Sequence, residues 1–313
     1  MKKTVFLMLA LCLVLGGCGA RREETLPVRV MVLNGSTGFG MAKLISDSAP
    51  EDYAFSVETD AAAVTAALVN GSCDIAALPT NAAAALYQKS GGAICCLALN
   101  TRGVLWLASD GSVPVSSLSD LEGQRVWVPA QNPAFIFSAL CEKAGVSVTA
   151  DTGFAQPADL RAALAAGKVP LAVLPEPLLS AACAANPRIS PALDLTAEWD
   201  ALFPAGSLVQ GCVVARREFA ESQPEAVSAF LRDCEASLAF CQTSPEEAAD
   251  CIAALGLAPS AALAAEALPR CNLCFLTGSE MAEALSAYLE IMLEQAPASV
   301  GGALPESDFY YGA

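Results

Sequence analysis

Short runs with the period of a β-strand alternate along this chain with longer runs that have the period of an α-helix. The first such unit is an apolar and β-branched strand at 28–33, a glycine-rich turn at 34–40 and a helix at 41–48. The other elements expected in this half are strands at 53–58, 73–78, 93–100 and 104–108, a helix at 61–70 between Asp60 and Gly71, and a helix that begins at 79 and runs through 89. This alternation predicts a mostly parallel sheet covered by helices.

The alternation begins again near residue 116, which indicates a second, short sheet. The elements expected there are a capped turn at 116–123, strands at 125–128, 146–152 and 171–174, and helices at 134–144, 157–166 and 178–185. One more strand is expected at 211–215. It is followed by helices at 224–243, 245–255, 261–268 and 279–295, and by a tail rich in glycine and aromatic residues at 301–311. The expected fold class is therefore α/β with two sheets.

The N-terminus has the pattern of an export signal. Lys2 and Lys3 precede an apolar run at 5–15, and small residues follow it. The run is too short for a helix that spans a bilayer, so the pattern predicts a secretory signal rather than a membrane-spanning anchor.

The end of this signal, Leu-Gly-Gly-Cys at 15–18, resembles the lipobox of bacterial lipoproteins. The resemblance implies removal of residues 1–17, lipidation of Cys18, and a lipid anchor and tether over 18–27. Such an anchor would hold the body at the extracytoplasmic face of the cell membrane. The alternative is an ordinary secreted protein in which Cys18 is incidental.

Composition excludes several classes of function. The 313 residues include 33 acidic and 17 basic ones, for a formal charge of −16, so nucleic acid and anionic lipid are poor partners. The chain has no histidine, which removes the usual Ser/His and Cys/His catalytic arrangements. We expect no resident metal and no cofactor.

The 13 cysteines are scattered without a framework spacing, and many lie in apolar runs. Apart from Cys18 and one in the signal, they are expected to be free, buried hydrophobic residues. Cys271 and Cys274 alone have the CxxC spacing of redox and zinc motifs. Local packing is expected there, and a disulfide or a metal remains the alternative.

Several segments and their order resemble one family of binding proteins. The first three are Val-Arg-Val-Met-Val-Leu-Asn-Gly-Ser-Thr-Gly-Phe-Gly at 28–40, Gly-Ser-Cys-Asp-Ile-Ala-Ala-Leu-Pro-Thr-Asn at 71–81 and Ser-Asp-Leu-Glu-Gly-Gln-Arg-Val at 119–126. With the signal, Arg-Arg-Glu-Phe at 216–219 and the ending at 301–311, they look like the solute-binding lipoproteins of ABC importers. The branch is the one grouped with binding proteins for aliphatic sulfonates, nitrate and thiamine precursors.

The resemblance implies a type 2 periplasmic-binding-protein fold, with two α/β lobes joined by a hinge. Lobe one would comprise 27–106 and 211–313, and lobe two 107–210. The implied protein captures a small polar molecule between its lobes and delivers it to the permease and ATPase subunits of an importer, as a monomer and without catalysis. Ligand would shift an equilibrium between open and closed forms. A surface sensor and an enzyme on the same fold are the alternatives.

Ligands of open α/β sheets bind beyond the carboxyl ends of the strands, where helix starts offer free N–H groups. Four segments of this chain meet that description. The candidate ligand-binding residues in them are Asn34, Ser36, Thr37 and Gly38, then Thr80 and Asn81, then Gln131 and Asn132, and finally Glu176. For each loop the alternative is turn or capping chemistry, such as an N-cap role for Thr80.

Glu176 is the strongest candidate, because a carboxylate between two prolines at a strand end has little evident capping duty. A carboxylate favours a ligand with a cationic or N–H donor group, whereas hydroxyls and helix starts favour an anion. These indications conflict unless Glu176 pairs with a base such as Arg102 or faces away from the site. The aromatic residues nearest the candidate loops are expected to be core residues; they are Phe39, Trp106, Phe135 and Phe154.

Overall fold

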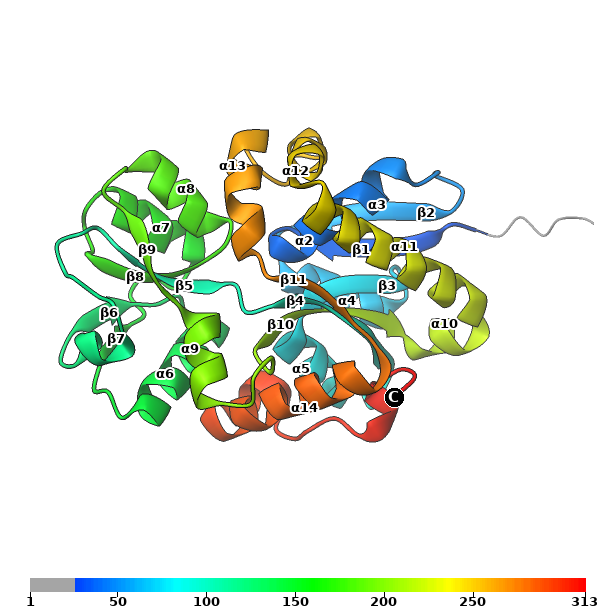
Figure 1. Ribbon diagram of the computed structural model, residues 1–313. Helices are drawn as coiled ribbons and strands as arrows, with labels where there is room; N and C mark the ends of the chain where they lie inside the picture. Colours follow the sequence, from blue (N-terminus) through cyan, green and yellow to red (C-terminus); the bar gives the residue numbers. More distant parts are fainter. Residues whose placement is uncertain (1–25) are drawn as a thin grey trace, which may run out of the picture.

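The computed structural model describes residues 26–313, which form two α/β lobes side by side (Figure 1). This arrangement confirms the expected fold class. Lobe 1 is built on a six-stranded sheet from residues 26–102 and 209–313, and lobe 2 on a five-stranded sheet from residues 105–202. The export signal and Cys18 lie outside the described residues. Within the described part, every helix is too short or too polar to span a bilayer.

Lobe 1 contains the N-terminal elements and the helical C-terminal region. Its strands are β1 (Val28–Leu33), β2 (Tyr53–Glu58), β3 (Ile75–Pro79), β4 (Ile94–Arg102), β10 (Val209–Arg216) and β11 (Leu273–Leu276). Its α-helices are α2 (Ser36–Gly40), α3 (Ala42–Asp47), α4 (Ala61–Asn70), α5 (Thr80–Ser90), α10 (Arg217–Ser222), α11 (Pro224–Thr243), α12 (Pro245–Ala254), α13 (Ala261–Ala267) and α14 (Gly278–Gln295). Short 3₁₀ turns are η2 (Leu268–Arg270), η3 (Pro297–Val300) and η4 (Ser307–Phe309).

Lobe 2 is smaller. Its strands are β5 (Leu105–Ser109), β6 (Arg125–Trp127), β7 (Thr149–Asp151), β8 (Leu171–Pro175) and β9 (Ser190–Asp194). Its helices are α6 (Asn132–Ala144), α7 (Pro157–Ala165), α8 (Leu178–Ala185), α9 (Leu195–Leu202) and the 3₁₀ turn η1 (Leu118–Leu121).

Both sheets are mixed rather than mostly parallel. The strand orders are β11-β4-β10-β3-β1-β2 and β7-β6-β8-β5-β9, and β10 and β5 each pair antiparallel with both neighbours. The crossings explain this difference. The chain enters lobe 2 through β5 and returns to lobe 1 through β10, so each of these two strands starts at the side where its neighbouring strands end.

Helices cover both faces of each sheet (Figure 1). In lobe 1, side chains of β1, β3 and β10 pack with α3 and α11 on one face, and others pack with α4, α5 and α14 on the opposite face. In lobe 2, α7 and α8 cover one face and α6 and α9 the other. The α5/α14 face of lobe 1 and the α6/α9 face of lobe 2 belong to one continuous apolar cluster. Apolar side chains of the two lobes are therefore packed together on this side.

Several elements differ from the sequence expectation. The glycine-rich segment at 34–40 is not a simple turn, because residues 36–40 form α2. A Cβ on Gly40 would lie 2.4 Å from Cδ2 of Leu238 in α11, so glycine lets these two helices approach closely. The edge strand β9 and helix α9 were not expected, and neither was β11, which includes the second cysteine of the CxxC segment.

Candidate functional site

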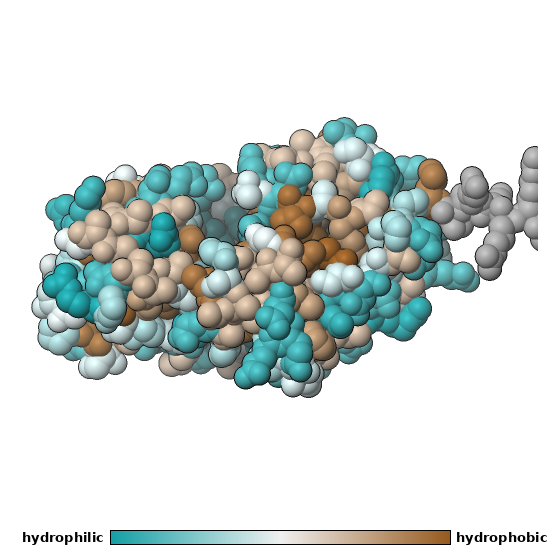
Figure 2. Space-filling view, turned by 90° about the horizontal axis from the view of Figure 1, so that it is seen from above, coloured by the Kyte–Doolittle hydropathy of each residue, from teal (hydrophilic) through white to brown (hydrophobic). Residues whose placement is uncertain are grey.

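The chain crosses between lobes at two short segments, 103–104 and 203–208. Side chains of lobe 1 hold the backbone of the first segment. Asn272 donates through Nδ2 to the carbonyl of Gly103 at 2.6 Å, and Gln210 accepts from the amide of Val104 at 2.8 Å. On the face that carries α8 and α13, Figure 2 shows a recess between the two lobes.

On this face, polar groups of both lobes meet. We call these contacts, made by Ser36, Glu176, Ser180 and Arg270, the polar bridge. Ser36 of lobe 1 donates to the carbonyl oxygen of Glu176 in lobe 2 at 3.2 Å. The Nε of Arg270, which ends η2 in lobe 1, donates to Oε1 of Glu176 at 2.5 Å. Arg270 also donates to Oγ of Ser180 at 2.8 Å.

Glu176 has a capping role that the sequence did not indicate. Its carboxylate accepts from the backbone N–H of Ser180 at 3.1 Å and from the Ser180 hydroxyl at 3.0 Å. These bonds place the carboxylate at the N-terminus of α8, where the helix dipole favours negative charge. The expectation that Glu176 lacks capping duty is therefore wrong. Its side chain is fully buried.

The base that pairs with Glu176 is Arg270 rather than Arg102, which instead donates to the carbonyl of Gly206. The Arg270 side chain is 20% exposed and also pairs with Glu266 at 3.0 Å. Burial opposes the Arg270 charge, but its hydrogen bonds to Glu176 and Glu266 raise the pKa above the ordinary value. Sequence reasoning missed Arg270, although it is the sole basic residue after Arg232.

The opposite face of the interface, which we call the apolar side, is made by different residues. Trp199 of lobe 2 lies 6.1 Å from Tyr288 of lobe 1, measured between ring centroids. The Tyr288 hydroxyl donates to Oδ1 of Asn132 at 3.0 Å, and Gln295 donates to Glu142 at 2.9 Å. Asn132 is thus a contact between the lobes, and its partner Tyr288 was not identified from the sequence.

The remaining candidates take varied places. Asn34 and Gln131 are exposed, and Gln131 adopts a positive φ of 65° before α6. Thr37 donates to the carbonyl of Leu33, four residues earlier in the chain. Gly38 is buried. No hydrogen bond in the described residues joins the polar bridge to Asn132.

Thr80 does not cap α5, because its hydroxyl donates to the carbonyl of Val209 at 2.7 Å. This bond ties the start of α5 to β10. The next residue, Asn81, has a buried Oδ1 that makes no hydrogen bond.

Asn100 is a buried polar residue that is not among the candidates named from the sequence. It is fully buried near the carboxyl end of β4, and its Nδ2 makes no hydrogen bond. Its Oδ1 accepts from the Thr101 hydroxyl at 3.2 Å. The sequence signal that could have identified Asn100 was the Asn-Thr pair at the end of an otherwise apolar strand.

Gly211 in β10 has no side chain, and this leaves room for the Asn100 side chain. A Cβ there would lie 2.7 Å from Oδ1 of Asn100 and 2.6 Å from Cγ2 of Thr37. Asn100 and Thr37 therefore converge on one point at the carboxyl ends of β1 and β4. Trp106, near the start of β5 in lobe 2, also has a buried Nε1–H without a partner.

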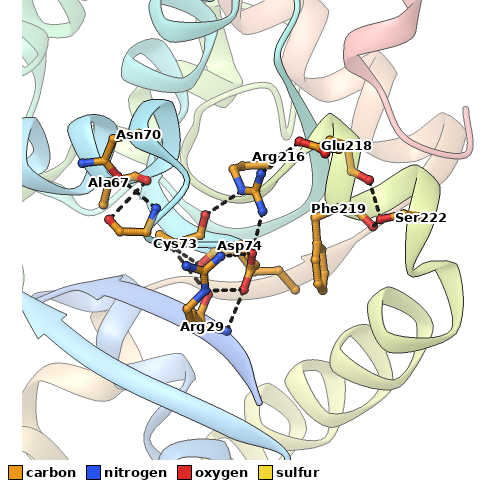
Figure 3. A network of polar contacts seen from close by, with 11 residues as sticks. Arg29, Ala67, Asn70, Cys73, Asp74, Arg216, Glu218, Phe219 and Ser222 are labelled. Atoms are coloured by element: carbon orange, nitrogen blue, oxygen red, sulfur yellow. Dashed lines mark hydrogen bonds and ion pairs between the residues drawn. The ribbon is translucent and has the colours of Figure 1, made fainter. Parts of the chain in front are cut away.

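Two surface hollows of the described residues lie elsewhere, at the opposite edge of lobe 1. Their volumes are about 1130 and 780 Å³, and both are lined by Arg216 and Glu218. Figure 3 shows that Asp74 is held there between Arg29 and Arg216, at 2.6 and 2.8 Å. Burial would raise the pKa of Asp74, but these hydrogen bonds outweigh it and lower the pKa. The carboxylate is thus saturated by protein partners, which indicates a structural role.

The eleven cysteines in the described part of the chain are all free thiols, and nine of them are buried. Burial raises the pKa of Cys271 to about 12 and that of Cys274 to about 11. Both thiols are therefore protonated near neutral pH. Between residues 26 and 313 no group of His, Cys, Asp or Glu side chains is arranged to hold a metal ion.

The fold and the facing strand ends define a two-lobed binding protein, and comparison with known proteins agrees. The chain is similar to an ABC transporter structure from Parabacteroides distasonis, with 23% identity, a TM-score of 0.79, and coverage of 91% of this chain and 99% of the other. It is also similar to the periplasmic aliphatic sulphonate binding protein SsuA from Escherichia coli, with 19% identity, a TM-score of 0.71, and coverage of 89% and 91%.

A third similar structure is the alkanesulfonate-binding SsuA from Xanthomonas axonopodis pv. citri bound to MOPS, with 16% identity, a TM-score of 0.64 and coverage of 90% and 96%. No curated protein matches the chain. The family described as NMT1/THI5 like matches residues 52–248. The chain belongs to this family, as its sequence motifs suggested.

Proposed function

We propose that this protein is an extracytoplasmic solute-binding protein that captures a small polar molecule between its lobes and delivers it to an ABC importer. The observation that carries the proposal is the polar bridge, which joins the carboxyl ends of strands from both sheets across the recess. Ligands of α/β sheets bind at such edges. Family membership and the names of the similar structures support the same function.

The proposed cycle is closure around the ligand. The polar bridge exists only when the lobes are together, so a molecule that contacts both lobes favours the closed form. A permease with its ATPase then recognises that form. In this proposal the protein acts as a monomer, forms no covalent bond with its ligand and needs no cofactor. The ligand-binding residues are expected among Ser36, Thr37, Asn81 and Asn100.

Lipid anchoring through Cys18 is part of the proposal. The Leu-Gly-Gly-Cys segment supports it. A Cys18→Ala variant should move from the membrane fraction to the soluble extracytoplasmic fraction, as followed by fractionation and intact mass. If the parent chain carries no acyl mass and stays soluble, this part of the proposal is wrong.

Ligand capture is tested by thermal denaturation of the purified chain against a panel of small polar metabolites. A ligand at about a hundred times its dissociation constant adds about 2.7 kcal/mol to the free energy of unfolding. For a chain of this size we expect the melting temperature to rise by about 5 °C. Chemical change of the bound compound, followed by mass spectrometry, would favour an enzyme instead, and absence of binding would refute the proposal.

A further inference from the structure

The charged groups of the polar bridge are already paired within the protein. Both oxygens of the Glu176 carboxylate are bonded, to Ser180 and to Arg270. Arg270 in turn contacts Glu176, Ser180 and Glu266. An ionic ligand would therefore have to break one of these pairs or enter without a counter-charge. Either route is costly in a buried site.

The N-terminus of α8 is the helix start that the polar bridge occupies. Free N–H groups at such a start commonly receive an anion. Here Glu176 itself fills that position, because its Oε2 accepts from the Ser180 amide. The overall charge of −16 also opposes the approach of anions. The protein thus supplies its own anion where a sulfonate or carboxylate would otherwise bind.

Four buried side-chain atoms of the described residues lack a hydrogen-bond partner, and all four belong to neutral groups; one of them, Ser299 Oγ, lies in η3 of lobe 1. Asn100 Nδ2 in lobe 1 and Trp106 Nε1 in lobe 2 are buried donors, and Asn81 Oδ1 is a buried acceptor. A buried polar atom without a partner costs about 1–3 kcal/mol, so each one requires an explanation, and a ligand that supplies the partner is one. Asn100 and Trp106 follow each other closely in the chain, on either side of the crossing at Gly103.

We infer that the ligand is an uncharged molecule with an acceptor oxygen, and that Asn100 and Trp106 are the residues that donate to it, one from each lobe. This inference rests on the proposed function and specifies the ligand class of the same site. A carbonyl or sulfonyl oxygen fits the two donors, and an N–H or O–H on the same molecule fits Asn81. The expected ligand class is therefore an amide or a similar neutral compound.

The test uses the full chain, purified in mild detergent. Small molecules released on denaturation are identified by mass spectrometry. In parallel, binding is measured by calorimetry for matched pairs of acids and their amides, such as ethanesulfonate with ethanesulfonamide and benzoate with benzamide. We expect the released molecule to be uncharged at pH 7 and the amide to be preferred at least tenfold in each pair that binds. An anion released, or the acid preferred, would overturn the inference and leave the proposed function standing.

Two variants test the named donors. Asn100→Asp replaces the donor by an acceptor of the same shape, and Trp106→Phe removes the indole N–H but keeps an aromatic ring. Each should weaken binding of the preferred amide, or of the released molecule, by about tenfold or more. Asn70→Asp is the matched control, because Asn70 is an exposed residue at the far end of α4. Unchanged affinity in both donor variants would refute their role, and a parent chain that neither releases nor binds any molecule would refute the proposed function itself.

Discussion

The ion pair between Glu176 and Arg270 should control closure more than folding. Glu176→Gln removes the charge but keeps an oxygen that can accept from Ser180. Breaking a buried ion pair costs about 3–5 kcal/mol when one charge is left without compensation. Arg270 keeps its pair with Glu266 and is 20% exposed, so we expect a smaller cost of about 1–2 kcal/mol.

Because this contact joins the two lobes, the cost falls on the closed form. The ratio of closed to open molecules should drop by about 5- to 30-fold. The apparent dissociation constant rises as the competent fraction falls. Calorimetry should therefore show weaker binding of the released or preferred compound, and small-angle scattering should show a larger radius of gyration for the ligand-free variant.

A matched control is Arg125→Gln, which breaks the pair with Asp151 inside lobe 2. Arg125 is 59% exposed, so its loss should cost less than about 1 kcal/mol and leave affinity unchanged. If Glu176→Gln lowers the melting temperature but matches Arg125→Gln in affinity and radius of gyration, the reasoning about closure is refuted. The pair would then contribute only to the stability of the fold.

Three further predictions concern other parts of the molecule. Gly211→Ala forces a Cβ to within 2.7 Å of Asn100 and should cost about 1–3 kcal/mol in chemical denaturation; an unchanged midpoint would contradict the packing argument. Asp74→Asn should lose about 2–3 kcal/mol at pH 7. Because the folded pKa of Asp74 is below 3.8, its contribution to stability is present above that pH and is lost as the pH falls through the lowered value. Parent and variant should therefore converge at acid pH, below 3.8, in denaturation measured across pH. Brief alkylation at pH 8 should label the half-buried Cys183 and Cys251 before the buried thiols, as read by peptide mass spectrometry; early labelling of Cys95, whose pKa burial raises to about 12, would be the contrary result.

Local signals predicted much of the fold. The bounds of α8 and α11 follow from helical period and flanking residues, and Asp60 and Gly71 cap α4 as expected, with Asp60 accepting from Ala62 and Gly71 in the left-handed region. In contrast, β9 was missed because it is a short edge strand that contains Pro191, which reads as a breaker. Strand direction in the mixed sheets depends on where the chain crosses between lobes, which periodicity does not report.

The site was predicted only in part, since its contacts join distant residues. Glu176 was found because of its place at a strand end, but its partner Arg270 lies 94 positions further along the chain. Asn100 was not identified because a short polar ending on an apolar strand is common and does not by itself indicate a binding residue. Its importance follows from the missing side chain at Gly211 and from a donor that has no partner, which only the folded structure reveals.

The two sides of the lobe interface differ in polarity, and this asymmetry determines how the lobes can separate. Water can replace the charged contacts of the polar bridge, whereas exposing the apolar surface between Trp199 and Tyr288 to water costs free energy. Separation should therefore begin at Arg270 while Trp199 and Tyr288 stay in contact. The opening between the lobes is then wedge-shaped, wide at the polar bridge and narrow at Trp199 and Tyr288. A ligand could extend toward the wide end, whereas atoms directed at the narrow end would hold the lobes apart. Ligand size would therefore be limited from one side only.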